Sequence, residues 1–321
     1  MCVNLISAKK LSEKKLRELT EELLSVFTEK DFEKDFLDNV CVYACGSLAR
    51  YELVEDSDLD LFFINNTEDV FSNLKKYNFF SLLHKVNKKL GFEDPSKHGM
   101  YWDFTAKKDL LDIGSRNEDY NNSLTARLLL ILESKPILNE KLYENILKEV
   151  IEKYFVDYEK REGDFYPMYL INDIFRYWYT LTLNYEFRRD SKDSPNEKCW
   201  KRLKLKYARL LTCFSFVACL FEKDITQDKV IAIIKKSPLE RLDYIAGLDS
   251  ANQELQTAIS EVKKRYSEFI RLRKEETPSY WETQENKKSA FQNADEFHCA
   301  VNKLMAEIYK FNPELKSKLD F

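Results

Sequence analysis

Two acidic residues beside an apolar segment are the first candidates for chemistry in this chain. Asp58 and Asp60 stand two apart at the start of the apolar run 59–64, which has the length and flanks of a short buried strand. Residues two apart in a strand point the same way, so both carboxylates would project from one face. Like charges held that close repel each other unless a cation lies between them. A hard divalent cation with oxygen ligands, Mg²⁺ or Mn²⁺, is the natural partner.

A glycine–serine pair upstream supplies the complementary half of such a site. Gly46 and Ser47 follow a second apolar run, residues 40–45, which also predicts a strand. Glycine lets the backbone approach a ligand closely, and the next residues can begin a helix whose N–H groups face an anion. Either half alone is commonly a turn or a solvated surface. Together, each joined to an apolar strand, they favour phosphoryl chemistry on a nucleoside triphosphate.

The two halves resemble a known signature. The segments GSLARYE (46–52) and SDLDLFF (57–63) resemble the polymerase-β-type nucleotidyltransferase superfamily. They most resemble its uridylyltransferase-like branch, which includes bacterial PII-protein uridylyltransferases and nucleotidyltransferases of unassigned substrate. A weaker resemblance to the latter group continues through residues 123–140 and 170–189.

The resemblance implies roles for five residues of the motif. It implies that Asp58 and Asp60 are metal ligands. It also implies that Gly46 and Ser47 contact the triphosphate. Arg50 matches the arginine of the branch's motif, and it would either contact phosphate or support the turn.

A third carboxylate from a later strand is common in enzymes of the resembled kind. The candidates here are Asp103, Asp112 and Glu93. Asp103 lies between Trp102 and Phe104 in the best strand candidate of that region, so we expect it to be the catalytic one. With only two carboxylates, the site would bind a nucleotide and a metal but lack a general base for a hydroxyl nucleophile.

Helices and strands around the motif must position these residues. Hydrophobic periodicity predicts an amphipathic helix over 11–30, with Ser12 as a plausible N-cap. A second helix over 68–90 ends at Gly91 and implies a strand on either side of it. The run GMYWDFTA (99–106) predicts a loop followed by a short strand.

The rest of the chain is predicted to be helical. Periodic segments predict a helix that begins near Leu124 and ends near Pro136, and further helices over residues 139–156, 168–190, 198–209, 225–247, 250–275 and 283–311. We expect an α+β protein: a nucleotidyltransferase domain with a small mixed sheet at 1–150 and an all-α domain at 151–321. The boundary is placed within 134–165.

Two features of the helical part have alternative interpretations. Arg176 either pairs with Asp173 at i, i+3 amid aromatic packing, or faces the cleft to hold phosphate or base. The basic stretch 198–209 is either a solvated helix face or a set of cations that faces Ser47 and binds triphosphate or an acidic second substrate. Its cationic stripe consists of Lys198, Arg202, Lys206 and Arg209.

Composition excludes several classes of protein. The 321 residues are 44% hydrophobic with a net charge of −4, which indicates a globular chain without the overall basic excess of many nucleic-acid-binding proteins. Seven cysteines without a C-x-x-C pair predict neither a disulfide framework nor a zinc site. A P-loop motif is absent, and no apolar run is long enough to span a membrane. We therefore expect a cytoplasmic protein that does not enter a membrane.

The sequence thus predicts a Mg²⁺-dependent nucleotidyltransferase. It would transfer an NMP from an NTP to a hydroxyl group of a protein, a small molecule or an RNA, and release pyrophosphate. The alternative is a catalytically inactive module that keeps the fold, binds a nucleotide or a partner, and lacks the third carboxylate.

Overall fold

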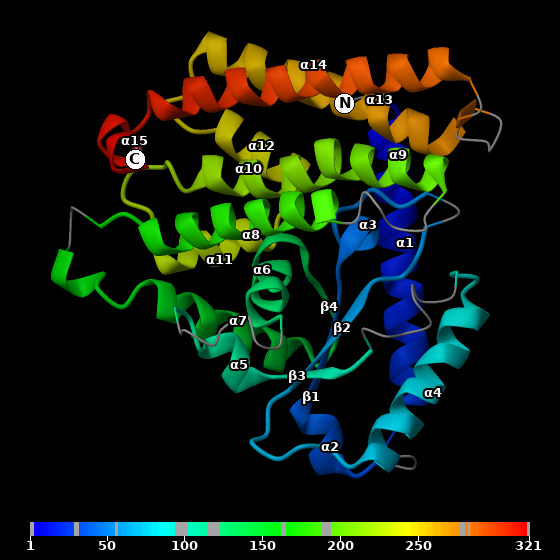
Figure 1. The fold of residues 1–321 in the computed structure, drawn as a ribbon. Coiled ribbons are helices and arrows are strands. Elements are labelled where there is room, and N and C mark those ends of the chain that lie inside the picture. The colour runs from blue at the N-terminus through cyan, green and yellow to red at the C-terminus, as the bar shows by residue number, and fades with distance from the viewer. Residues whose placement is uncertain are drawn as a thin grey trace. The chain divides into compact units, whose positions relative to one another are not determined.

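The chain divides into two compact units (Figure 1). The computed structural model describes residues 3–28, 32–54, 57–93, 102–114, 122–161, 165–187, 194–275, 280–281 and 283–319. We call Leu5–Tyr154 the sheet unit, and Phe155–Phe321 together with Met1–Asn4 the helical unit. The division follows Tyr154, which lies within the range 134–165 expected for the boundary and four residues after the expected end of the first domain at residue 150.

The sheet unit contains all strands of the described residues, with helices before, between and after them (Figure 1). Its elements are α1 (Val3–Val26), α2 (Lys34–Asn39), β1 (Val40–Ala44), α3 (Gly46–Ala49), β2 (Leu61–Asn65), α4 (Asn73–Lys89), β3 (Phe104–Ala106), α5 (Lys107–Leu111), α6 (Ser123–Glu133), β4 (Lys135–Leu138) and α7 (Glu140–Tyr154). The prediction of an α+β protein with a small mixed sheet is confirmed.

The four strands lie in the order β3-β2-β1-β4. β1 runs antiparallel to both β2 and β4, and β2 runs parallel to β3. The parallel pair is joined by α4, so the predicted crossover helix has a strand on either side. The sequence does not predict β4, because Pro136 looks like the end of a helix. At the edge of the sheet, proline is tolerated since one side of the strand needs no donor.

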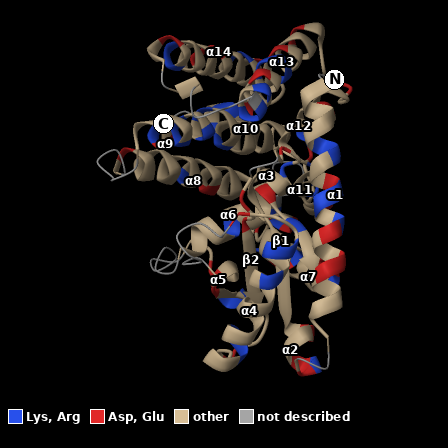
Figure 2. Ribbon diagram, turned by 90° about the vertical axis from the view of Figure 1, so that its right-hand side faces the viewer, with Lys and Arg blue, Asp and Glu red and all other residues tan. Residues whose placement is uncertain are grey.

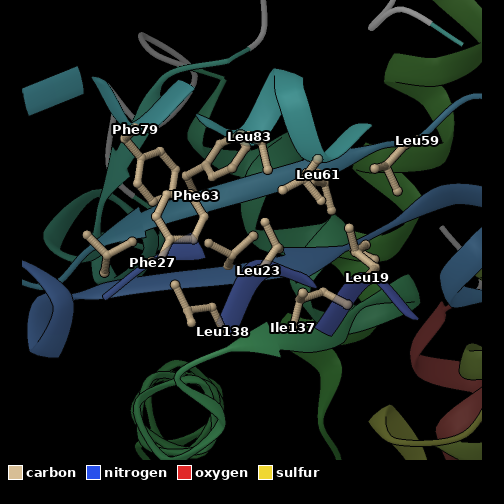
Figure 3. Close-up of a cluster of buried hydrophobic side chains, with 14 of the residues drawn as sticks. Leu19, Leu23, Phe27, Leu59, Leu61, Phe63, Phe79, Leu83, Ile137 and Leu138 are labelled. Carbon is tan, nitrogen blue, oxygen red and sulfur yellow. The ribbon is translucent and has the colours of Figure 1, made fainter. Parts of the chain in front are cut away.

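One face of the sheet carries a large apolar core (Figure 3). Phe63 of β2 packs edge-on against Phe79 of α4, with ring centroids 5.7 Å apart. Leu19 and Leu23 of α1 lie in the same cluster and are fully buried. Alternate residues of β1 and β2 point to this face, as strand geometry requires.

The opposite face of the sheet is covered by α6 and α7. Tyr43 of β1 stacks on Phe62 and approaches Tyr143 of α7, with ring centroids 5.7 and 6.2 Å away. Burial raises the pKa of Tyr43 well above its ordinary value. The sheet is therefore enclosed on both faces, and a polar site is expected only where its strands end.

Helix α1 begins eight residues before the start of the predicted helix 11–30. It carries both basic and acidic residues along its length (Figure 2). Ser12 is wrong as an N-cap, because it lies inside the helix and is fully buried. Its hydroxyl donates to Ala8 O at 2.8 Å and accepts from Leu53 N at 3.0 Å. It therefore ties α1 to the loop that follows the motif turn.

The helical unit contains only helices among its described residues. They are the 3₁₀ turn Glu159–Arg161, α8 (Met168–Phe187), α9 (Pro195–Lys204), the π turn Leu205–Arg209, α10 (Leu210–Cys219), α11 (Gln227–Ile234), α12 (Pro238–Ala246), α13 (Gln253–Glu275), α14 (Gln284–Tyr309) and α15 (Pro313–Leu319). Within the described part of the chain, no helix is both long and apolar enough to cross a membrane.

The single helix predicted over 225–247 is wrong, because two helices occupy it. Ser237 and Glu240 form a capping box at the start of α12, with Pro238 in the first turn. The Ser237 amide donates to Glu240 Oε2 at 2.8 Å. A capping box with proline at the first helical position begins a new helix even when the hydrophobic period continues across it.

Candidate active site

The turn after β1 brings Gly46 against Asp60. Gly46 adopts φ +67°, a left-handed conformation that favours glycine. A Cβ built on Gly46 would collide with Asp60 Oδ2. The chain therefore needs glycine here for both its conformation and the space that the aspartate occupies.

The backbone explains why these two residues meet. Cys45 N donates to Asp60 O at 2.9 Å, which extends the β1–β2 pairing one residue beyond the Ala44–Leu61 pair. Asp60 thus lies opposite Cys45 and next to Gly46. The predicted strand over 59–64 is shifted, since β2 spans Leu61–Asn65, but the hydrogen bond from Cys45 N continues its pairing to Asp60.

Burial alternates along the segment that carries the two aspartates. Leu59 and Leu61 are each 3% exposed and point into the core (Figure 3), whereas Asp58 and Asp60 are half-buried. This period of two places the carboxylates on the face away from that core. Among the described residues, the Asp58 carboxylate has no hydrogen-bond partner.

The short helix α3 presents its first amides next to the Asp60 carboxylate, which lies against Gly46. Arg50 N donates to Gly46 O at 3.1 Å. The N–H groups of Gly46 and Ser47, in contrast, lie in the first turn, where no carbonyl of the helix can accept from them. Ser47 is 8% exposed, and within the described part of the chain its hydroxyl makes no hydrogen bond. Donors for an anion and acceptors for a cation therefore lie side by side.

Arg50 is held by two carboxylates. Its Nε donates to Glu52 Oε2 at 2.9 Å, and its Nη1 donates to Glu133 Oε2 at 2.5 Å. The Arg50 side chain is 7% exposed, and both glutamate side chains are 1% exposed. Of the two roles left open for Arg50, these contacts favour support of the turn.

Sequence reasoning missed Glu133 and the residues around Tyr51. Glu133 stands 83 residues from Arg50 and ends α6, where no local pattern connects it to the motif. Tyr51 adopts φ +62°, and its ring lies 5.4 Å from Lys9 Nζ and 5.0 Å from Lys135 Nζ. Two ammonium groups on one aromatic ring add positive charge beside the motif.

Asp103 lies at the start of β3, but its carboxylate is turned to α4. Lys76 Nζ donates to Asp103 Oδ1 at 2.7 Å, and the Asp103 side chain is 68% exposed. Its two alternatives, Asp112 and Glu93, are exposed as well. Among the residues that the structure describes, no three of His, Cys, Asp and Glu gather closely enough to hold a metal ion.

A pair of carboxylates nevertheless fits Mg²⁺ or Mn²⁺. Mg²⁺ keeps several waters and is usually held by one or two carboxylates together with substrate phosphates, rather than by a complete cage of protein ligands. Asp58 and Asp60 offer such a pair, and Asp60 lies beside the donors of α3. The residues present therefore suit a metal that arrives with a nucleotide.

Several cations of the helical unit have partners within that unit. Arg176 Nη1 donates to Asp173 Oδ1 at 2.9 Å, so the predicted i, i+3 pair is confirmed. In the basic stretch, Lys206 pairs with Asp295 at 2.5 Å, and the Arg202 guanidinium lies 4.7 Å from the Phe291 ring centroid. Part of this stretch thus holds α14 rather than facing solvent.

A hollow along α13 and α14 contains paired charges. Its volume is about 630 Å³. Arg265 in its wall donates to Glu261 at 2.6 Å and also pairs with Glu296. These contacts hold the two helices together, and we assign no chemistry to the hollow.

Comparison of the chain with protein-family models, with curated proteins and with solved structures finds no match. No family is therefore assigned. What can be argued about function depends on the motif and on the geometry around Gly46 and Asp60.

Proposed function

We propose that the sheet unit is a Mg²⁺-dependent nucleotidyltransferase domain that transfers an NMP from an NTP to a hydroxyl acceptor on a protein, a small molecule or an RNA. The packing of Gly46 against the Asp60 carboxylate carries the proposal. It puts a carboxylate, which suits a cation, next to a turn whose amides suit an anion, and a metal-bound triphosphate needs both.

Each part of the motif has a role in this reaction. Asp58 and Asp60 would hold Mg²⁺ or Mn²⁺, which offsets the charge of the triphosphate. The amides of Gly46 and Ser47 would bind the β- and γ-phosphates. Their hydrogen bonds stabilise the negative charge that develops there as the bond to the α-phosphorus breaks.

The acceptor hydroxyl and its proton take part in the rest of the reaction. The acceptor oxygen forms a bond to the α-phosphorus, and pyrophosphate leaves. The hydroxyl proton passes to a general base, for which Asp103 is our candidate. Asp103 would have to exchange its contact with Lys76 for one with the acceptor, and the exposed position of its carboxylate favours such an exchange.

Transfer of label from an α-labelled NTP tests the proposal. Fractionated protein, RNA and small-molecule acceptors would be incubated with the chain, each NTP and Mg²⁺. We expect labelled acceptor and released pyrophosphate, and a loss of at least about a hundredfold in Asp58→Asn and Asp60→Asn. Unchanged transfer in both variants would contradict the proposal.

A second candidate function follows from the position of Asp103. Because its carboxylate pairs with Lys76, the site could bind a nucleotide without activating an acceptor. Calorimetry with NTPs, with and without Mg²⁺, separates the two functions. Metal-dependent binding without transfer, abolished in Asp58→Asn, would favour a regulatory module. The absence of both binding and transfer would contradict both functions.

A further inference from the structure

The second half of α8 exposes large apolar side chains on one side. Tyr179 is 62% exposed, Leu183 68% and Phe187 88%. They are spaced by four residues and cover about 80° of the helix circumference. The helix packs on α10 through other residues, such as Trp178, whose ring lies edge-on to Phe214 with centroids 5.8 Å apart. An apolar surface of this size is often functional, so it is a candidate interaction site.

Opposite charges flank these apolar residues on the same side of α8. Arg176 precedes Tyr179 by three residues, and Glu186 follows Leu183 by three. With Phe187, these five residues form what we call the α8 stripe, which spans about 100° of the helix. The spacing of three, four and three residues from Arg176 to Glu186 is that of a coiled-coil seam.

We propose that the α8 stripe is the contact between two copies of this chain, paired antiparallel about a two-fold axis near residue 181. In this register Tyr179 packs on the partner's Leu183. Arg176 meets the partner's Glu186. Because the axis is two-fold, each contact occurs twice.

The charge arrangement of the stripe favours a second copy over an unrelated partner. The charged residues lie at equal distances on either side of the axis, so one antiparallel register brings both unlike pairs together. The Arg176 side chain is 42% exposed, and Nη1 binds Asp173 at 2.9 Å. A guanidinium has five N–H donors, so this contact is compatible with a second carboxylate.

The size of the stripe sets the expected strength of the dimer. Three apolar side chains with these exposures offer on the order of 400 Å² per copy. Two copies would therefore bury somewhat under about 1,000 Å², together with the flanking charges, which is typical of a weak interface. We expect dissociation in the micromolar range rather than an obligate dimer.

Sedimentation of the full chain over a range of concentrations is the first test. We expect a monomer–dimer equilibrium that is weakened roughly a hundredfold or more in Leu183→Arg, because each interface would then hold two unpaired cations. The matched control is Leu74→Arg on α4, since Leu74 is 70% exposed and lies outside the stripe. This control should dimerise as the wild type does.

Disulfide trapping tests the register. The double variant Tyr179→Cys/Leu183→Cys should give a covalent dimer on oxidation, in higher yield than either single variant or the wild type. A chain that stays monomeric near 100 μM, well above the range expected for an interface of this size, would overturn the proposal. A dimer that persists in Leu183→Arg would also overturn the proposal. Unfolding of Leu183→Arg but not of Leu74→Arg would overturn it too, since the α8 stripe would then be covered within one chain. None of these outcomes depends on nucleotide chemistry.

Discussion

A side chain at Gly46 would be unfavourable both because of the backbone conformation and because the Asp60 carboxylate occupies the space. In Gly46→Ala the left-handed conformation costs about 1 kcal/mol, and displacement of the Asp60 carboxylate adds roughly 1–3 kcal/mol. We expect unfolding free energy to fall by that sum and affinity for Mg²⁺–NTP to fall with it. Chemical denaturation and calorimetry measure the two effects.

Gly91 is the matched control for this substitution. It also has positive φ, +72°, but a Cβ there would meet nothing within 4 Å. Gly91→Ala should therefore lose only about 1 kcal/mol and bind nucleotide as the wild type does. Equal losses in the two variants would show that the contact between Gly46 and Asp60 contributes nothing.

The sequence could predict this pair of residues but not all of their surroundings. Gly46 and Asp60 belong to a local motif, and strand alternation places the aspartates on one face. The contact between Arg50 and Glu133 joins residues 83 positions apart and follows from the pairing of β1 with β4. Without that unpredicted strand, Glu133 could not be placed beside the motif.

At the scale of elements, Arg50 links α3 to the end of α6. Arg50→Met would leave two buried carboxylates without their guanidinium and should lower unfolding free energy by about 3–5 kcal/mol. Adding Glu52→Gln and Glu133→Gln should recover much of this loss, because the uncompensated charges are then absent. Thermal or chemical unfolding of the single and triple variants measures both effects.

The pair of Lys76 and Asp103 is the control for that prediction. It also joins elements of the sheet unit, but the Asp103 side chain is 68% exposed, so Lys76→Met should change unfolding free energy by less than about 1 kcal/mol. Losses of similar size in Arg50→Met and Lys76→Met would show that burial of the Arg50 pairs adds no stability.

Element boundaries were hardest to predict where tertiary contacts overrode local signals. Ser12 looks like a cap but binds Leu53 across the unit. Pro136 looks like a stop but lies in an edge strand. Helices α11 and α12 share one apolar period and are separated only by the capping box at Ser237. The helix predicted over 283–311, in contrast, is close to the observed α14, Gln284–Tyr309.

At the scale of the whole molecule, both units contain buried thiols that oppose ionisation. Burial raises the pKa of Cys41 in the sheet unit from 9.0 to about 12. Burial likewise raises the pKa of Cys219 in the helical unit from 9.0 to about 12. Between these values the unfolded chain loses thiol protons that the folded chain retains, so stability is full below pH 9 and falls as pH rises through this range.

The slope of that loss is a prediction. Each thiol should reduce unfolding free energy by about 1.4 kcal/mol per pH unit above pH 9, so the two units should weaken together. Urea unfolding between pH 8 and 10 measures the slope before most tyrosines titrate. Cys41→Ala should remove the contribution of that thiol to the slope. If the unfolding free energy stays constant to pH 10, water reaches these thiols in the folded chain. If Cys41→Ala keeps the wild-type slope, water reaches Cys41, and the sheet is less enclosed than its packing indicates.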